Sequence, residues 1–506
     1  MKKFILFFSI SFLIASPQLT VVLIIDSFAS HHIEKLQPYL HHGLKTFLDK
    51  GIWFQNTTYP HGCPITAPGH ASLSTGTKPK DNGIFATSWI KHGKKIAIQQ
   101  ALPQKLRKKT LNEFFVEQDP HHYACSFSLK NYAALLMAGK KTPALWFNSQ
   151  TLQFTGNSLS QEPLDAMNKT NQYLTQIFKK SLSWSLAYTD QKYYTFPHIN
   201  NYKHLRPEPY INKLIKKEDP HFSEIFIRSP QTNQMLLDLS LDYLERTIQK
   251  KPKKIMLWIS LSSLDQVTHY FGPQSKETVD TIYHLDYYIK SFMDKVSQLI
   301  SPDKTLYVLT ADHGFMKLPE LRNPPQKSFV APDIQNEINQ KLYKKYNKKN
   351  IIEALKTPFI YINQSALKTF SQQEQKQIHE DAKKALKKHP AIASVYESKK
   401  LLKNKHKATS KKWLLQNLIY LPRCGSLIFK VKPNIVIKNA PNKTTHNTPY
   451  EENLHVPLIF YQPSKHKGGI ITEPFWTPQL AATLARILKI KSFNKEAFPP
   501  LPLALS

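Results

Sequence analysis

Six side chains of metal-binding type lie at or just after the ends of apolar stretches, or in loops. In chain order they are Asp26, Asp265, His269, Asp312, His313 and His446. Asp265 and His269 read D-Q-V-T-H, and an i, i+4 pair on a helix shares one face, as two ligands of one ion require. Three carboxylates and three imidazoles can hold two metal ions about 4 Å apart, which can clamp the attacking and leaving oxygens of an in-line displacement.

A hydroxyl that could act as a nucleophile lies in the stretch "PITAPGHASLSTG". Because Pro68 suits the first turn of a helix, we expect Thr66 at the helix N-cap. Unpaired amide hydrogens and the helix dipole favour negative charge there. Thr66 could be a plain cap. Beside two metal ions, it could also supply the attacking oxygen of a phosphoryl transfer.

The elements around these residues alternate between strands and helices. Apolar runs such as "VVLIID", "KIMLWISLSS" and "TLYVLTADHG" are separated by helical patterns such as "SKETVDTIYHLDYYIKSFMDKVSQLI". This alternation predicts an α/β fold with a mostly parallel central sheet flanked by helices. Ligands bind such sheets at the carboxyl ends of the strands, where the acidic and histidine residues fall.

Two regions are predicted to be additions to this sheet. Residues 150–250 are rich in Asn, Gln, Tyr and Pro, and we interpret them as a cap-like insertion. Residues 320–440 contain strand-like "PFIYIN", a polar helix "SQQEQKQIHEDAKKALKK" and strand-like "AIASVYES", which indicates a smaller inserted α+β region. The catalytic domain would then comprise residues 17–319 and 441–506.

The N-terminus predicts export. Lys2 and Lys3 precede "FILFFSISFLIA" and Ser16, the pattern of a signal peptide over residues 1–16. We expect a periplasmic or secreted protein, and an uncleaved membrane anchor remains open because Pro17 is an awkward residue after a cleavage point. Three cysteines, Cys63, Cys125 and Cys424, allow at most one disulfide, and the sequence does not choose the pair.

The composition argues against a nucleic-acid-binding protein. The formal charge is +33, but it comes mostly from lysine, with only seven arginines, and no zinc-finger spacing, RNP-like stretch or leucine heptad is present. We interpret the charge as a solvated surface, including the lysine-rich residues 399–412. Contact with an anionic membrane surface stays open. The oligomeric state cannot be inferred from the sequence.

The motifs "IID", "ITAPGHASLSTG", "SLK", "DQVTHYFGP", "TADHG" and "HNTPY", in this order, resemble the alkaline phosphatase superfamily. They are most similar to the branch with a threonine nucleophile, which comprises type I phosphodiesterases, nucleotide pyrophosphatases and related bacterial alkaline phosphatases. The resemblance implies the alkaline phosphatase-like fold and two zinc ions. One zinc would be held by Asp265, His269 and His446. The other would be held by Asp26, Asp312 and His313, with Thr66 as nucleophile towards it.

Three positions depart from the pattern of this family. Thr87, in "DNGIFATSWI", replaces an Asn that binds a phosphoryl oxygen. Lys130 is kept, but Tyr132 replaces an Arg that neutralises the charge of a phosphomonoester. Asn447 replaces the Gly after the last metal histidine. A sulfatase is excluded, because Cys63 is followed directly by Pro64 and no C-x-P-x-R motif is formed.

The sequence therefore predicts a zinc-dependent hydrolase of small-molecule phosphate esters that acts through a phosphothreonine. Lys130 favours a phosphomonoesterase. Tyr132, a neutral ring in place of Arg, is the reason to keep a phosphodiesterase or nucleotide pyrophosphatase as the alternative. A zinc-bearing binding protein with weakened turnover is a second alternative. His455, in "LHVP", is interpreted as a packed loop residue.

Overall fold

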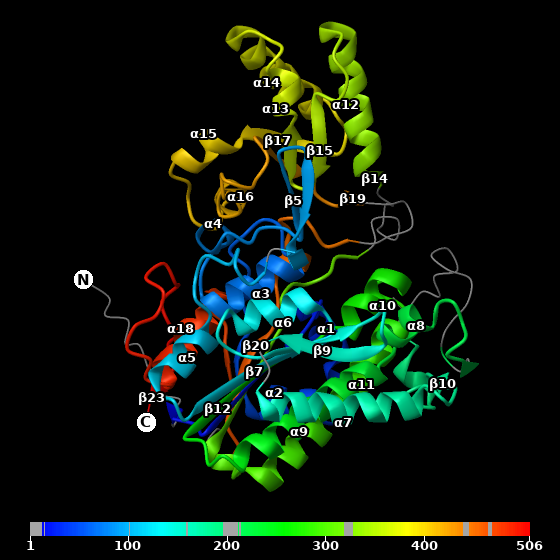
Figure 1. Ribbon diagram of the computed structural model, residues 1–506, viewed down its shortest axis with the longest axis vertical. Helices are drawn as coiled ribbons and strands as arrows, with labels where there is room; N and C mark the ends of the chain where they lie inside the picture. Colours follow the sequence, from blue (N-terminus) through cyan, green and yellow to red (C-terminus); the bar gives the residue numbers. More distant parts are fainter. Residues whose placement is uncertain are drawn as a thin grey trace, which may run out of the picture.

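The computed structural model describes residues 13–14, 16–100, 102–157, 160–195, 211, 214–317, 327–438, 445–463 and 468–505. It consists of a large lower part built on a wide sheet and a smaller upper part that carries its own sheet (Figure 1). The predicted signal peptide lies outside the described residues except for positions 13, 14 and 16. Within the described ranges, no helix combines the length and the apolar character that crossing a bilayer requires.

The large sheet has nine strands in the order β21-β3-β20-β13-β2-β12-β7-β8-β9. Their bounds are Gly469–Ile471, Ile52–Phe54, Leu458–Tyr461, Thr305–Thr310, Leu19–Ile25, Lys254–Leu261, His122–Ser128, Ala144–Asn148 and Gln153–Asn157. The five strands from β13 to β8 are parallel, whereas β20 and β9 run antiparallel to their neighbours in that group. The predicted α/β fold with a mostly parallel sheet is confirmed.

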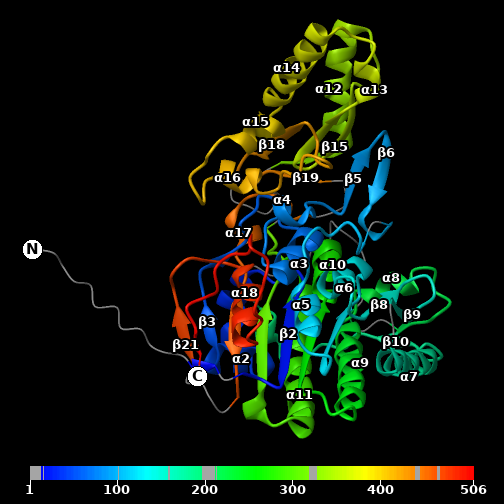
Figure 2. The ribbon, with the colours of Figure 1, turned by 60° about the vertical axis from the view of Figure 1, so that its left-hand side comes forward.

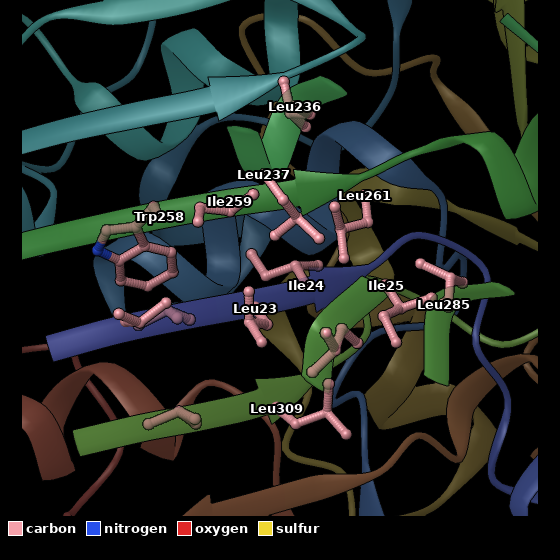
Figure 3. Packing of buried hydrophobic residues seen from close by; sticks show 14 of the residues in the cluster. Leu23, Ile24, Ile25, Leu236, Leu237, Trp258, Ile259, Leu261, Leu285 and Leu309 are labelled. Carbon is pink, nitrogen blue, oxygen red and sulfur yellow. The ribbon is translucent and has the colours of Figure 1, made fainter. Parts of the chain in front are cut away.

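Helices cover both faces of this sheet. On one face α2 (Gly43–Lys50), α9 (Gln231–Ile248) and α11 (Lys276–Leu299) pack together, and on the other lie α3 (Thr66–Thr75), α5 (Leu111–Gln118), α6 (Asn131–Ala138) and α18 (Gln479–Ile487) (Figure 1). Every residue of β2 is buried, as expected for a central parallel strand. Figure 3 shows the result: Leu23 of β2 and its register partner Ile259 of β12 lie with Leu237 of α9 in one hydrophobic core.

The region predicted as a cap-like insertion is partly built into the catalytic core. Within residues 150–250, β9 is the edge strand of the large sheet, and α9 packs against β12 and β7. Each element keeps a side that is not buried, which accounts for the polar residues that suggested an addition. The three cysteines are all free, with Cys63 and Cys125 buried.

The upper part lies within the predicted α+β insert. Its sheet has the order β15-β16-β18-β17, with bounds Ile352–Lys356, Phe359–Ile362, Leu427–Val431 and Ile392–Glu397. Helices α12 (Ala331–Tyr346) and α14 (Gln372–Lys387) pack on it around a separate hydrophobic core. A hairpin of the lower part, β5 (Ser88–Lys91) and β6 (Lys94–Ala97), rises beside β15 (Figure 2). The two parts therefore meet above the carboxyl ends of the parallel strands.

Candidate active site

The six predicted metal ligands converge above the carboxyl ends of β2, β12 and β13. Asp26 directly follows β2, and Asp312 and His313 follow β13. Asp265 and His269 lie on α10 (Ser263–Phe271), the helix that follows β12, as their spacing predicted. His446 comes from a loop of the chain that returns from the insert. The strands are neighbours in the sheet, which brings together residues more than 400 positions apart.

These residues form two groups whose ligand atoms lie within 4.8 Å of one another. In the first group, the Nε2 atoms of His269 and His446 are 3.2 Å apart and lie 3.4 and 3.7 Å from Asp265 Oδ1. In the second group, His313 Nε2 lies 3.3 Å from Asp26 Oδ1 and 3.4 Å from Asp312 Oδ2. The groups match the two ligand sets that the resemblance implied.

The donor atoms of both groups fit metal ions. Asp26 Oδ1, Asp265 Oδ1 and Asp312 Oδ2 are buried and accept no hydrogen bond from the described residues. A buried carboxylate oxygen without a donor is costly, and a cation removes that cost. These same oxygens lie closest to the histidine Nε2 atoms. Nitrogen and oxygen ligands of this kind are typical of zinc and related divalent ions.

Two of the histidines are held in the ring orientation that a metal requires. His313 Nδ1 lies 3.0 Å from the Gly314 carbonyl, and His446 Nδ1 lies 2.9 Å from the Pro64 carbonyl. A carbonyl only accepts, so each Nδ1 donates its hydrogen and each Nε2 presents a lone pair to the site. The two rings stack with their centroids 3.6 Å apart, which links the two ligand groups.

Thr66 lies beside the second group. Its Oγ1 is 3.4 Å from His313 Nε2 and 3.1 Å from Lys130 Nζ, which donates to it. The helix α3 begins at Thr66 itself, and the N-cap residue is Ile65, which makes no side-chain cap. The prediction that Thr66 is the N-cap is therefore wrong by one position. Its hydroxyl is directed into the site and does not satisfy a helix terminus.

Lys130 connects the two ligand groups through their carboxylates. Its ammonium donates to Asp26 Oδ2 and to Asp265 Oδ2, both at 2.6 Å. Each aspartate thus uses Oδ2 for the lysine and keeps Oδ1 on the side of its histidines. The Lys130 side chain is 10% exposed, so these charge pairs are weakly screened. The lysine fixes the orientation of both carboxylates.

The charges of the site shift the pKa values of its members. Burial favours the neutral carboxyl, but the Lys130 ammonium and the neighbouring histidines together outweigh it and lower the pKa of Asp26 and of Asp265. Burial also opposes the charge of His313, yet Asp312 and Asp26 raise its pKa to about 9. Burial and the charge of His313 hold the pKa of His446 well below its usual range. A metal ion would displace the proton of His313.

A cavity of 730 Å³ opens from Thr66 towards the insert. Thr87, Tyr132 and Asn447, the three departures from the family pattern, all line it. Burial and the neighbouring aspartates raise the pKa of Tyr132 against the effect of Lys130, so its hydroxyl is neutral and can donate. His455 lies apart from the site, where its Nε2 donates to the Gln55 carbonyl at 2.7 Å. It is a packed loop residue, as interpreted.

One residue near the site was not singled out from the sequence. His70 is fully buried on α3, with Nδ1 2.9 Å from the Thr66 carbonyl and 3.3 Å from Asp312 Oδ2. Its Nε2 lies 2.9 Å from Ser260 Oγ. His70 therefore ties helix α3 to the predicted ligand Asp312 and to β12. The i, i+4 spacing from Thr66 within "TAPGH" was the signal that could have revealed it.

Comparison with known proteins places this site in a family. The sequence profile of the type I phosphodiesterase/nucleotide pyrophosphatase family matches residues 20–455. The chain belongs to this family. The match spans both the large sheet and the insert. It includes the six residues of the two ligand groups and also Thr66. A member of this family with this site is a phosphoric ester hydrolase, and the family implies metal cofactors and phosphate ester substrates.

Two curated relatives of this phosphodiesterase family member are phosphatases. The chain is 24% identical to alkaline phosphatase PafA of Elizabethkingia meningoseptica over 94% of its own length and 92% of the relative. It is 23% identical to alkaline phosphatase PhoD of Zymomonas mobilis, over 94% and 86% of the two chains. The crystal structure of wild-type PafA superimposes with a TM-score of 0.84 at 20% identity, covering 97% of this chain and all of the other. The shared fold thus includes the insert.

Proposed function

We propose that this protein is a zinc-dependent phosphomonoesterase that acts through a covalent phosphothreonine at Thr66. The observation that carries the proposal is the position of Thr66 Oγ1, which lies between the second ligand group and the ammonium of Lys130. The hydroxyl opens to a large cavity and is not used as a helix cap. The names of the two curated relatives support phosphatase activity.

Two zinc ions would be held by the two ligand groups defined above. When bound, they would supply positive charge to the attacking, leaving and non-bridging oxygens. Lys130 adds a charge fixed in the protein. It donates to Thr66 Oγ1 at 3.1 Å, which favours the alkoxide form of the nucleophile. Such fixed charges act without reorganisation during the reaction.

The reaction proceeds in two steps, the formation of the phosphothreonine and its hydrolysis. Thr66 loses its proton to solvent, and its oxygen forms a bond to phosphorus while the bond between phosphorus and the alcohol oxygen breaks. The departing alkoxide takes a proton from water. A water molecule then attacks phosphorus, the Thr66–phosphorus bond breaks, and inorganic phosphate and the threonine hydroxyl are released. The net change is the hydrolysis of one ester bond by one water molecule.

The preference for a monoester rests on Lys130. A monoester carries more negative charge than a diester, and the Lys130 ammonium lies within 3.1 Å of the nucleophile. Tyr132 is the specific observation that favours a phosphodiesterase as the second candidate. It lines the same cavity and offers a neutral hydroxyl where Arg would add charge.

The test replaces Thr66 and compares two substrates with the same leaving group. Thr66→Ala should lower kcat/KM for 4-nitrophenyl phosphate by about 1,000-fold or more while zinc content is retained, and Thr66→Ser should keep part of the activity. Thr75→Ala is a matched control, because Thr75 is a buried threonine at the other end of α3 whose hydroxyl donates to the Ala71 carbonyl. It should lose some stability but no more than twofold in activity.

Four results would contradict the proposal. Near-parental turnover by Thr66→Ala would exclude the phosphothreonine. Absence of zinc from the active protein would exclude that metal. A higher kcat/KM for methyl 4-nitrophenyl phosphate than for 4-nitrophenyl phosphate would assign the site to diesters. Full-length protein without activity on either ester would favour the zinc-bearing binding protein.

A further inference from the structure

The cavity above Thr66 has charged side chains at both of its ends. Its floor is the site itself, and its far end is formed by the β5–β6 hairpin and by the insert. Lys95 of β6 and Lys356, the last residue of β15, both line this far end. The two lysines belong to different sheets, and the hairpin rises beside β15 (Figure 2), so both sheets contribute to the lining of the cavity.

Neither lysine is neutralised by the protein. Among the described residues, no carboxylate lies within salt-bridge distance of Lys95 or Lys356, whereas Lys341, Lys345 and Lys383 in the insert's helices each have an acidic partner. Lys356 is half-buried, and burial together with the charge of Lys95 lowers its pKa. Two like charges that line one cavity repel each other, and an anion bound near both removes that repulsion.

One acidic residue also lines the cavity and has to be considered. Glu353 has its carboxylate beside the hairpin turn, where Oε1 would be 3.4 Å from a Cβ added to Gly93. Burial raises its pKa, and it also lines a second cavity beside His92. Among the described residues, Glu353 forms no ion pair with either lysine.

The surroundings attract anions over a longer range. Residues 327–438 contain 24 lysines and arginines against seven aspartates and glutamates. This part of the chain forms the roof of the cavity, so its field raises the local concentration of anions at the cavity mouth. The volume of 730 Å³ is far more than a phosphoryl group occupies and is typical of pockets that hold a whole small molecule.

We propose that Lys95 and Lys356 form a second anion subsite, so that the preferred substrate is a phosphate monoester whose alcohol part carries another phosphate group. This inference rests on the proposed function at Thr66, because the first phosphate must lie at the nucleophile. The second phosphate would accept hydrogen bonds from both ammonium groups at the far end of the cavity. Its recognition adds binding energy that a simple monoester lacks.

The experiment compares monophosphates and bisphosphates of the same linear diols, from three to eight carbons, with the zinc-loaded full chain. A bisphosphate has two equivalent ends, which alone doubles its kcat/KM. After correction for this factor of two, we expect kcat/KM for at least one bisphosphate to exceed that of its monophosphate by about tenfold or more. Lys95→Met and Lys356→Met should each remove most of this preference. Both variants should keep monophosphate hydrolysis within twofold, which also shows that they are folded.

Lys94→Met is the matched control, because Lys94 is the neighbouring exposed residue of the same strand and does not line the cavity. It should keep the preference, and Lys356→Arg should retain it in part. The inference would be overturned if the wild-type protein showed no preference for a bisphosphate at any chain length. It would also be overturned if the preference survived in both methionine variants, or if it fell equally in Lys94→Met. A further test uses phosphate monoesters of the same chain length that end in a carboxylate. A higher kcat/KM for these compounds than for the bisphosphates would also overturn the inference. Failure of the proposed function would appear separately, as full activity of Thr66→Ala.

Discussion

Replacement of Lys130 by methionine tests whether the two ligand groups depend on one ammonium. The variant keeps a chain of similar length but removes the charge that lies 2.6 Å from Asp26 Oδ2 and from Asp265 Oδ2. Both carboxylates are at most 2% exposed, so each would lose its closest cation at a buried position. Removal of one partner of a buried ion pair costs about 3–5 kcal/mol. We expect a loss of this size in the free energy of unfolding at neutral pH, in protein freed of metal by a chelator.

The loss should depend on pH with a defined sign. Folding lowers the pKa of Asp26 and of Asp265 from 3.8, so the stabilisation they contribute is present above that value and is lost as pH falls. Folding raises the pKa of Lys130, so its contribution is complete at neutral pH and is lost only in strong alkali. In the variant, burial raises the pKa of Asp26 and of Asp265, because the Lys130 ammonium no longer opposes its effect. They then take up protons on mild acidification, so the difference from the parent should shrink between about pH 7 and about pH 4.5.

The assay is urea unfolding followed by circular dichroism, at both pH values and with chelator present. Lys290→Met is the control, because Lys290 pairs with Asp294 at 2.7 Å on the surface, with both side chains about half exposed. It should change the free energy of unfolding by about 0.5 kcal/mol or less. A loss below about 1 kcal/mol in Lys130→Met at pH 7, or a loss of equal size at both pH values, would refute the reasoning.

Two further predictions concern pH and location. Because the folded state raises the pKa of His313 from 6.5 to about 9, its contribution to the stability of metal-free protein is complete below 6.5 and is lost as pH rises through about 9. The urea midpoint of chelated protein should therefore fall between pH 7 and about pH 9.5 by more than that of His313→Gln, and an equal fall in both would contradict the assignment. The lysine start and the apolar run of residues 1–16 predict export, so the intact chain fused to a reporter that is active only outside the cytoplasm should give signal. A silent reporter on an expressed fusion would exclude export.

Much of the fold could be predicted because its main elements carry strong periodic signals. The run "LTVVLII" has no polar side chain except Thr20, and only a strand buried on both faces can accommodate it. Asp26 and Asp312 could be placed at the carboxyl edge because each directly follows such a run. The half-exposed elements of residues 150–250 gave no comparable signal. Their polar faces concealed that β9 and α9 belong to the main sheet.

The sequence by itself determined the types of side chain at the site, the helical pairing of Asp265 with His269, and the order of motifs that identifies the family. It could not choose among 21 histidines without those motifs. Only the tertiary structure decided that the Thr66 hydroxyl faces Lys130, that Lys130 bridges two aspartates, and that Lys95 and Lys356 line one cavity. Contacts between distant segments depend on the order of the strands in the sheet and on how the insert folds back over that sheet. Local periodicity records which face of each element is buried but not which other element covers it.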